Sequence, residues 1–190
     1  NVSFLTVGNG GTVDAELLTK LTSVHTTLNG GDSPGNLATS QWTEFDDANL
    51  TINGMHPDLS GLTTVSNVYF TLQKGQDSDP APSVYLQNLT NADGSSFRVL
   101  DGAQLSLPNL TSYSAGTIGY ANTFRAEGAG STIDFSNLTS FTGKTGSHRF
   151  RVDALAGGVI DLSGIDKIDE GYSLFDANGA GSLIDLSALT

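Results

Sequence analysis

The sequence predicts an all-β protein that folds as a right-handed parallel β-helix of about seven coils, in one domain over residues 1–190. Three observations predict this fold. Residues 128–139 (GAGSTIDFSNLT) recur at residues 179–190 (GAGSLIDLSALT) with nine of twelve positions identical. Inside each copy apolar and polar residues alternate with a period of two, which is typical of strands and not of helices. Gly and Asn, which favour turns, mark the corners between these short strands.

The repeat unit is defined by apolar residues at fixed offsets. With Ile133 as position zero, Phe135, Leu138 and Phe141 follow at +2, +5 and +8. The +5 residues along the chain are Leu18, Leu62, Leu89, Leu110, Leu138, Ile165 and Leu189. Their steps are 21 to 28 residues except for the first, 44, which predicts one unit plus an insertion over residues 29–51.

Units of this size stack best as a parallel β-helix, in which each coil pairs with the next about 4.8 Å away. A strict six-residue rhythm is absent, which favours the right-handed form. The sequence opens directly on a strand pattern and ends where another coil would begin, so we expect a piece excised from a larger multidomain protein.

The composition excludes several classes of partner and site. Eight basic residues stand against 20 acidic ones, so neither nucleic acid nor an anionic membrane surface is an expected partner. No apolar run approaches the roughly 20 residues that span a bilayer. The absence of Cys excludes disulfide scaffolds and zinc–thiolate sites. The Ser-, Thr-, Asn- and Gly-rich composition is typical of a secreted or cell-surface bacterial protein.

Stacking turns each repeated position into a column on the surface. Position +4 carries Asn88, Asn109 and Asn137, and position +6 carries a column of threonines. We expect both to be structural ladders that bond one coil to the next. The asparagines also form N-x-T sequons, but the repeat itself explains them.

A column of aspartates at position +1 is the candidate metal site. Asp134, Asp161 and Asp185 should lie on adjacent coils, where like charges repel one another. A bound Ca²⁺ would relieve this repulsion, since carboxylates and hydroxyls are ligands that it prefers. The alternative is a solvated acidic face supported by the serines two positions later, Ser136, Ser163 and Ser187.

A second column collects much of the positive charge. The repeat places Arg98, Arg125 and Arg151 together, with Glu127 and Asp153 two positions further on the same outward face. One interpretation is a charge-paired ladder of little energetic weight. The other is a row of planar donors and acceptors that binds sugar hydroxyls or uronate carboxylates.

Two aromatic residues lie at the corner beside this column. Trp42 falls in the long insertion, and Tyr120 falls at the same corner in a later coil. An exposed ring next to polar groups can stack on a pyranose face. Trp42 is equally well interpreted as a cap over the core under its own insertion.

Catalytic motifs are absent from the sequence. The three histidines share no metal-binding spacing, and no nucleophile elbow or phosphate-binding loop occurs. The carboxylate pairs, Asp46 with Asp47 and Glu127 with Asp153, are of the kind that hydrolyses glycosides, but such pairs are expected by chance among 20 acidic residues. We therefore expect a protein that is not an enzyme.

The I-D-L-S-x-L-T coils resemble repeats of large secreted bacterial proteins, and the chain's size resembles a β-helical carbohydrate-binding module of the xylan-binding type. This resemblance implies a non-catalytic module for a plant or algal cell-wall polysaccharide, covalently linked to catalytic or adhesive domains, and it transfers no binding residues. The alternatives are a stalk segment of a bacterial surface protein and, third, a small polysaccharide lyase or hydrolase, because the fold resembles that of pectate lyases and polygalacturonases.

Overall fold

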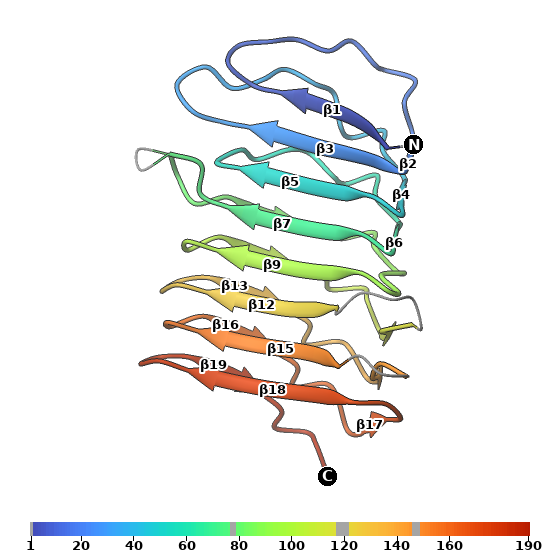
Figure 1. The fold of residues 1–190 in the computed structure, drawn as a ribbon, viewed down its shortest axis with the longest axis vertical. Coiled ribbons are helices and arrows are strands. Elements are labelled where there is room, and N and C mark those ends of the chain that lie inside the picture. The colour runs from blue at the N-terminus through green and yellow to red at the C-terminus, as the bar shows by residue number, and fades with distance from the viewer. Residues whose placement is uncertain (1, 77–78, 117–121, 146–148) are drawn as a thin grey trace.

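The computed structural model describes residues 2–76, 79–116, 122–145 and 149–190. In these residues the chain forms short strands and no helix, and the strands stack as a parallel β-solenoid of about seven turns (Figure 1). The chain runs from right to left along the front sheet and from left to right behind it while it descends, which is a right-handed winding (Figure 1). The fold prediction is confirmed. No helix that is long and apolar enough to cross a membrane occurs among the described residues.

Four sheets form the sides of the solenoid, and all pairings between their strands are parallel. The long front sheet contains, in order, β1 (Ser3–Val7), β3 (Val24–Asn29), β5 (Asn49–Asn53), β7 (Tyr69–Gln73), β9 (Ser96–Leu100), β12 (Thr123–Glu127), β15 (Phe150–Leu155) and β18 (Ser173–Asn178). A second sheet contains β8 (Ser83–Tyr85), β10 (Gln104–Ser106), β13 (Thr132–Asp134), β16 (Val159–Asp161) and β19 (Leu183–Asp185). Two shorter sheets contain β2 (Lys20–Thr22), β4 (Glu44–Asp46) and β6 (Thr64–Ser66), and β11 (Ser112–Ser114), β14 (Ser140–Thr142) and β17 (Ile168–Asp169).

The +5 column forms the anchor of every coil. At this position the backbone N–H donates to the carbonyl three residues earlier, as Leu138 does to Phe135 at 2.8 Å. The turn directs the anchor side chain into the core, where Leu110, Leu138 and Ile165 are completely buried. Apolar residues alternate with polar ones because only one face of each strand faces this core.

The residues predicted as an insertion are instead a complete coil. Residues 29–51 contain β4 and most of β5, and the Trp42 N–H donates to the Thr39 carbonyl at 3.0 Å, as anchor residues do. Trp42 therefore occupies the anchor position that Leu or Ile fills elsewhere, and the step of 44 residues divides into 24 and 20. Its side chain is 0% exposed and packs edge to face on Phe45, with ring centroids 5.3 Å apart.

The prediction that Trp42 stacks on a sugar is wrong, because its ring lies in the core. The alternative interpretation, a cap over the core, correctly places the ring in the core. Residues 29–51 nevertheless form a coil and not an insertion. The apolar pattern does not reveal this coil, because a polar residue, Thr39, occupies +2 and Trp42 occupies +5. Thr39 is accommodated in the interior because its hydroxyl donates to the Asp58 carbonyl at 2.6 Å.

The asparagine column is structural, as predicted. Each carboxamide donates to a backbone carbonyl of the preceding coil: Asn88 to Ser60 at 2.6 Å, Asn109 to Gln87 at 2.5 Å and Asn137 to Pro108 at 2.8 Å. Threonine hydroxyls at +6 bond to the preceding coil in the same way, as Thr139 does to Thr111.

Candidate functional site

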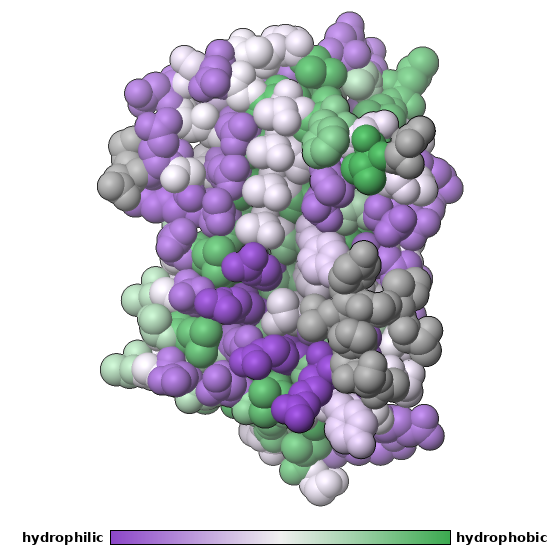
Figure 2. Space-filling view, viewed as in Figure 1, coloured by the Kyte–Doolittle hydropathy of each residue, from purple (hydrophilic) through white to green (hydrophobic). Residues whose placement is uncertain are grey.

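The outward face of the long sheet presents polar columns in register. One column runs through all eight strands: Thr6, Thr27, Thr51, Thr71, Arg98, Arg125, Asp153 and Asp176. Figure 2 shows this face, with a near-white column of intermediate hydropathy in its upper half and purple, strongly hydrophilic residues below. The threonine part of the face is uncharged, whereas the part over β9, β12, β15 and β18 is charged.

The three arginines do not form one column, which corrects the sequence prediction. Arg98 pairs with Arg125, but Arg151 pairs with Thr123, and Asp153 takes the place beside Arg125. The step in register from β12 to β15 is 28 residues, whereas Arg151 follows Arg125 by only 26. Glu127 and Asp153 consequently lie in different columns as well.

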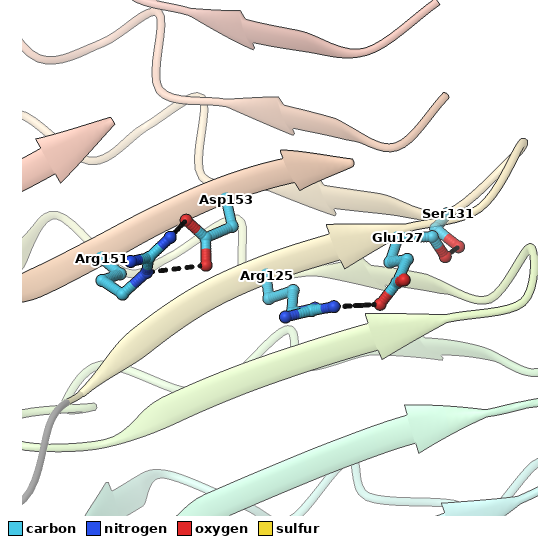
Figure 3. Close-up of polar contacts among 5 residues, drawn as sticks. All are labelled: Arg125, Glu127, Ser131, Arg151 and Asp153. Atoms are coloured by element: carbon cyan, nitrogen blue, oxygen red, sulfur yellow. Dashed lines mark hydrogen bonds and ion pairs between the residues drawn. The ribbon is translucent and has the colours of Figure 1, made fainter. Parts of the chain in front are cut away.

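Two of the arginines are neutralised by carboxylates on their own strands (Figure 3). Arg125 donates through Nε and Nη2 to Glu127 Oε2, at 2.9 and 2.5 Å. Arg151 forms a two-pronged pair with Asp153, at 3.1 and 2.9 Å, and this hydrogen bonding raises the pKa of the Arg151 guanidinium further. Among the described residues Arg98 is exposed and forms no ion pair. This arrangement favours the charge-paired interpretation for Arg125 and Arg151 and leaves Arg98 as an accessible cation.

A groove lies along the edge of the same sheet where strands β3, β5 and β7 begin. Its volume is about 320 Å³, at the lower end of the range for small-ligand sites. Two columns of residues line it, of which one crosses four successive coils and the other three. One is the corner column of Ser23, Asp47, Asn67 and Gly94, and the other is the strand column of His25, Asn49 and Tyr69.

The corner column has a conformational cause. Ser23, Asp47, Asn67 and Gly94 all have positive φ, at 54°, 48°, 54° and 68°. Asn, Asp and Gly are the residues that tolerate this left-handed conformation best. Each of these corners also donates its N–H to a carbonyl of the next coil, as Asp47 does to Ser66 at 3.0 Å. The corners are therefore held at the spacing of the coils.

The strand column follows two residues after each corner. His25, Asn49 and Tyr69 are in register on adjacent strands and point outward, because their neighbours Thr26, Leu50 and Phe70 point into the core. Tyr69 is 39% exposed, so part of this residue is accessible from solvent. Asn122 lines the same groove and is held in place, because its Oδ1 accepts from Lys144 Nζ at 2.8 Å and its Nδ2 donates to the Gly94 carbonyl.

This groove is not among the sites predicted from the sequence, although the sequence contains a signal for it. Ser23-x-His25, Asp47-x-Asn49 and Asn67-x-Tyr69 place a turn residue two positions before a large polar residue in three consecutive coils. The apolar repeat is regular in the later coils and less regular in the early ones, where these residues lie. Tyr120, the other aromatic residue predicted for the site, lies outside the described residues.

The aspartate column is in register as predicted. Asp134, Asp161 and Asp185 pair directly along β13, β16 and β19. One oxygen of each carboxylate accepts the N–H of the serine two residues later, at 2.9 to 3.0 Å. Burial raises the pKa of the Asp134 carboxyl, but hydrogen bonds from Ser136 and from the Ser106 hydroxyl outweigh this effect and lower it.

These hydrogen bonds favour the solvated acidic face over a calcium site. Among the described residues no group of three or more His, Asp or Glu side chains is arranged to hold a metal ion. We therefore expect EDTA to leave the melting temperature unchanged. Thermal melts followed by circular dichroism, with and without excess Ca²⁺, test this. A fall in EDTA that Ca²⁺ reverses, and that Asp161→Asn abolishes, would instead establish calcium at this column.

The carboxylate pairs considered for catalysis are engaged in other contacts. Glu127 and Asp153 accept from arginines, and one Asp47 oxygen accepts from the Ser23 hydroxyl at 3.4 Å.

No protein-family model, curated protein or solved structure matches the chain. The structure therefore assigns the chain to the class of parallel β-solenoids. The resemblance to a carbohydrate-binding module gains no support from known proteins.

Proposed function

We propose that this protein is a non-catalytic module that binds a neutral plant or algal cell-wall polysaccharide, such as a xylan, on the front face of the solenoid. The groove beside β3, β5 and β7 carries the proposal. Its walls present hydroxyl, carboxylate, carboxamide, imidazole and phenol groups at the spacing of successive coils. Such groups donate and accept the hydrogen bonds that sugar hydroxyls need, and the partly exposed Tyr69 ring offers a face for the apolar side of a pyranose.

The charges on this face favour a neutral polysaccharide over a uronate-rich one. Arg125 and Arg151 are already paired with carboxylates, and Asp47 contributes a negative charge to the groove itself. The chain as a whole carries a formal net charge of −12, which repels polyanions. A uronate chain would therefore form few favourable ion pairs on this face, and electrostatic repulsion would weaken its binding.

The setting of the module follows from the same proposal. In this proposal the module is covalently linked to catalytic or adhesive domains. The whole protein is secreted or held on a bacterial cell surface. The module requires no nucleic acid, membrane or cofactor for this task.

A panel of polysaccharides in affinity electrophoresis tests the proposal. We expect neutral xylan or β-glucan to retard the protein and polygalacturonate not to retard it. Arg98 lies on the front face outside the groove lining, so Arg98→Ala tests whether the site extends across β9: one lost charge-assisted hydrogen bond would weaken retardation about tenfold or more. Arg125→Ala is the matched control, because its guanidinium is already paired with Glu127. Equal retardation of both variants and wild type would remove Arg98 from the site, and no retardation by any neutral polymer would overturn the function.

A structural stalk is the second candidate, and the exposure of the end coils favours it. The anchor residue Leu189 is 39% exposed, whereas Leu138 and Ile165 in the same column are fully buried. At the other end, Leu5 and Leu18 are only half-buried. A second copy of the chain stacked on these ends would cover them. Sedimentation at increasing protein concentration tests this candidate, because end-to-end stacking produces assemblies that lengthen with concentration, and Leu189→Lys should weaken them.

A further inference from the structure

We propose that the groove binds a linear, extended, β-1,4-linked glycan whose axis is parallel to the solenoid axis, with one sugar unit on each of four coils. This inference rests on the proposed function and deepens it. It assigns the direction of the chain, the class of linkage and the number of sugar subsites, none of which follows from polysaccharide binding alone.

The register of the two walls sets the direction of the chain. The first three coils each contribute one corner residue and one strand residue: Ser23 and His25, then Asp47 and Asn49, then Asn67 and Tyr69. The fourth coil contributes Gly94 at the corner. Polar groups therefore repeat along the solenoid axis every ~4.8 Å. A ligand satisfies this series if it presents some polar group, not always the same one, at about each of these steps in the same direction.

Extended β-1,4-linked pyranose chains meet this condition. Each sugar advances the chain by about the distance between adjacent coils, which is ~4.8 Å for paired strands. A coiled α-linked glycan advances less for each sugar and curves out of a straight groove. A branched glycan fits only where each branch points to solvent. The groove accordingly selects straight chains.

The four subsites are not equivalent, which predicts where binding is strongest. The third subsite contains Tyr69, and its corner residue Asn67 extends its carboxamide over Gly94 of the fourth coil. Gly94 leaves the space that this carboxamide occupies, since a Cβ on Gly94 would collide with Asn67 Oδ1. The first subsite contains His25, whose ring meets the exposed Phe4 ring edge to face, with centroids 5.2 Å apart. We expect the Tyr69 subsite to contribute most.

A length series in calorimetry tests the inference. The ligands are linear β-1,4-linked xylo- and cello-oligosaccharides, from the disaccharide to the hexasaccharide, with malto-oligosaccharides as α-linked counterparts. We expect the affinity to rise with each sugar up to the tetrasaccharide and to be constant beyond it. The malto-oligosaccharides should bind at least about tenfold more weakly, as expected if one hydrogen bond in the series is lost.

Tyr69 and Tyr85 provide a matched pair of variants. Tyr85 is exposed on β8 of the second sheet, away from the groove, so Tyr85→Ala should bind the tetrasaccharide like wild type. Tyr69→Ala should bind it about three- to tenfold more weakly, since a stacked ring is lost. Tyr69→Phe keeps the ring and should retain most of the affinity. Circular dichroism confirms that each variant is folded.

Different results would contradict the proposed function and the four-subsite groove. If no neutral oligosaccharide or polysaccharide binds, the proposed function falls. If neutral polysaccharides bind but affinity does not depend on chain length, or Tyr69→Ala behaves like Tyr85→Ala, the four-subsite groove is overturned and the ligand lies elsewhere on the face. A plateau at the disaccharide would likewise contradict one sugar on each of four coils.

Discussion

Trp42→Ala is expected to lower the free energy of unfolding by about 3–5 kcal/mol, the usual cost of removing a large buried aromatic side chain. The Trp42 ring is fully buried at an anchor position and packs on Phe45. Its indole N–H has no hydrogen-bond partner in the structure, so the ring stabilises the fold through packing alone. Denaturant titration followed by far-ultraviolet circular dichroism measures the loss, because the variant lacks the only Trp as a fluorescent probe.

Trp42→Leu is the matched control for this prediction. Leu fills the anchor position in other coils, so this variant should lose clearly less stability than Trp42→Ala. Polysaccharide retention should not change in either variant while the protein is folded. If Trp42→Ala unfolds at the wild-type denaturant concentration and loses retention instead, Trp42 is a binding residue and the assignment of this coil is wrong.

Leu138→Ala is expected to cost about 2–5 kcal/mol of unfolding free energy. Leu138 is buried between the anchors Leu110 and Ile165 of the neighbouring coils, so its removal leaves a cavity in the middle of the stack. In a solenoid each coil is stabilised mainly by its two neighbours, and a central defect therefore weakens both interfaces. The same denaturant titration measures this loss.

Leu17→Ala is the control for Leu138→Ala. Leu17 is 94% exposed, so its truncation should change the unfolding free energy by no more than about 0.5 kcal/mol. Similar costs for the two variants would mean that the anchor column does not form the core.

The fold was predictable because every coil buries apolar side chains at the same positions of the repeat. A Leu or Ile at +5 and alternating apolar residues before it recur often enough to be read from the sequence alone. The one coil that was missed shows the limit of this reading. Its core positions are filled by Thr39, whose hydroxyl finds a backbone acceptor, and by Trp42, which replaces an aliphatic anchor.

The surface columns were predictable only close to the anchor. The aspartate column lies four residues before the anchor, and its predicted alignment is correct. The arginine column lies across a corner of variable length, and there the predicted alignment of Arg151 is wrong. A difference of one or two residues in a corner shifts every later position of that coil, which hydrophobic periodicity does not report.

The groove was harder to predict because it depends on backbone conformation. Its corner residues project beside the sheet as a result of positive φ, and nothing in the apolar pattern marks Ser23 as such a corner. Its strand residues His25, Asn49 and Tyr69 share no chemical type, so they do not stand out as a repeat. Their common feature, one polar side chain at the same place in each coil, becomes visible only in register.

A crystal structure of the protein with a neutral β-1,4-linked tetrasaccharide would show where, and in which direction, a glycan chain binds. We expect one chain of sugars along the groove, parallel to the solenoid axis, with one pyranose stacked on Tyr69, one beside Asn49, one beside His25 and one beside Gly94. A sugar chain that crosses the sheet along its strands, lies on another side of the solenoid, or is absent at a saturating concentration would contradict this expectation.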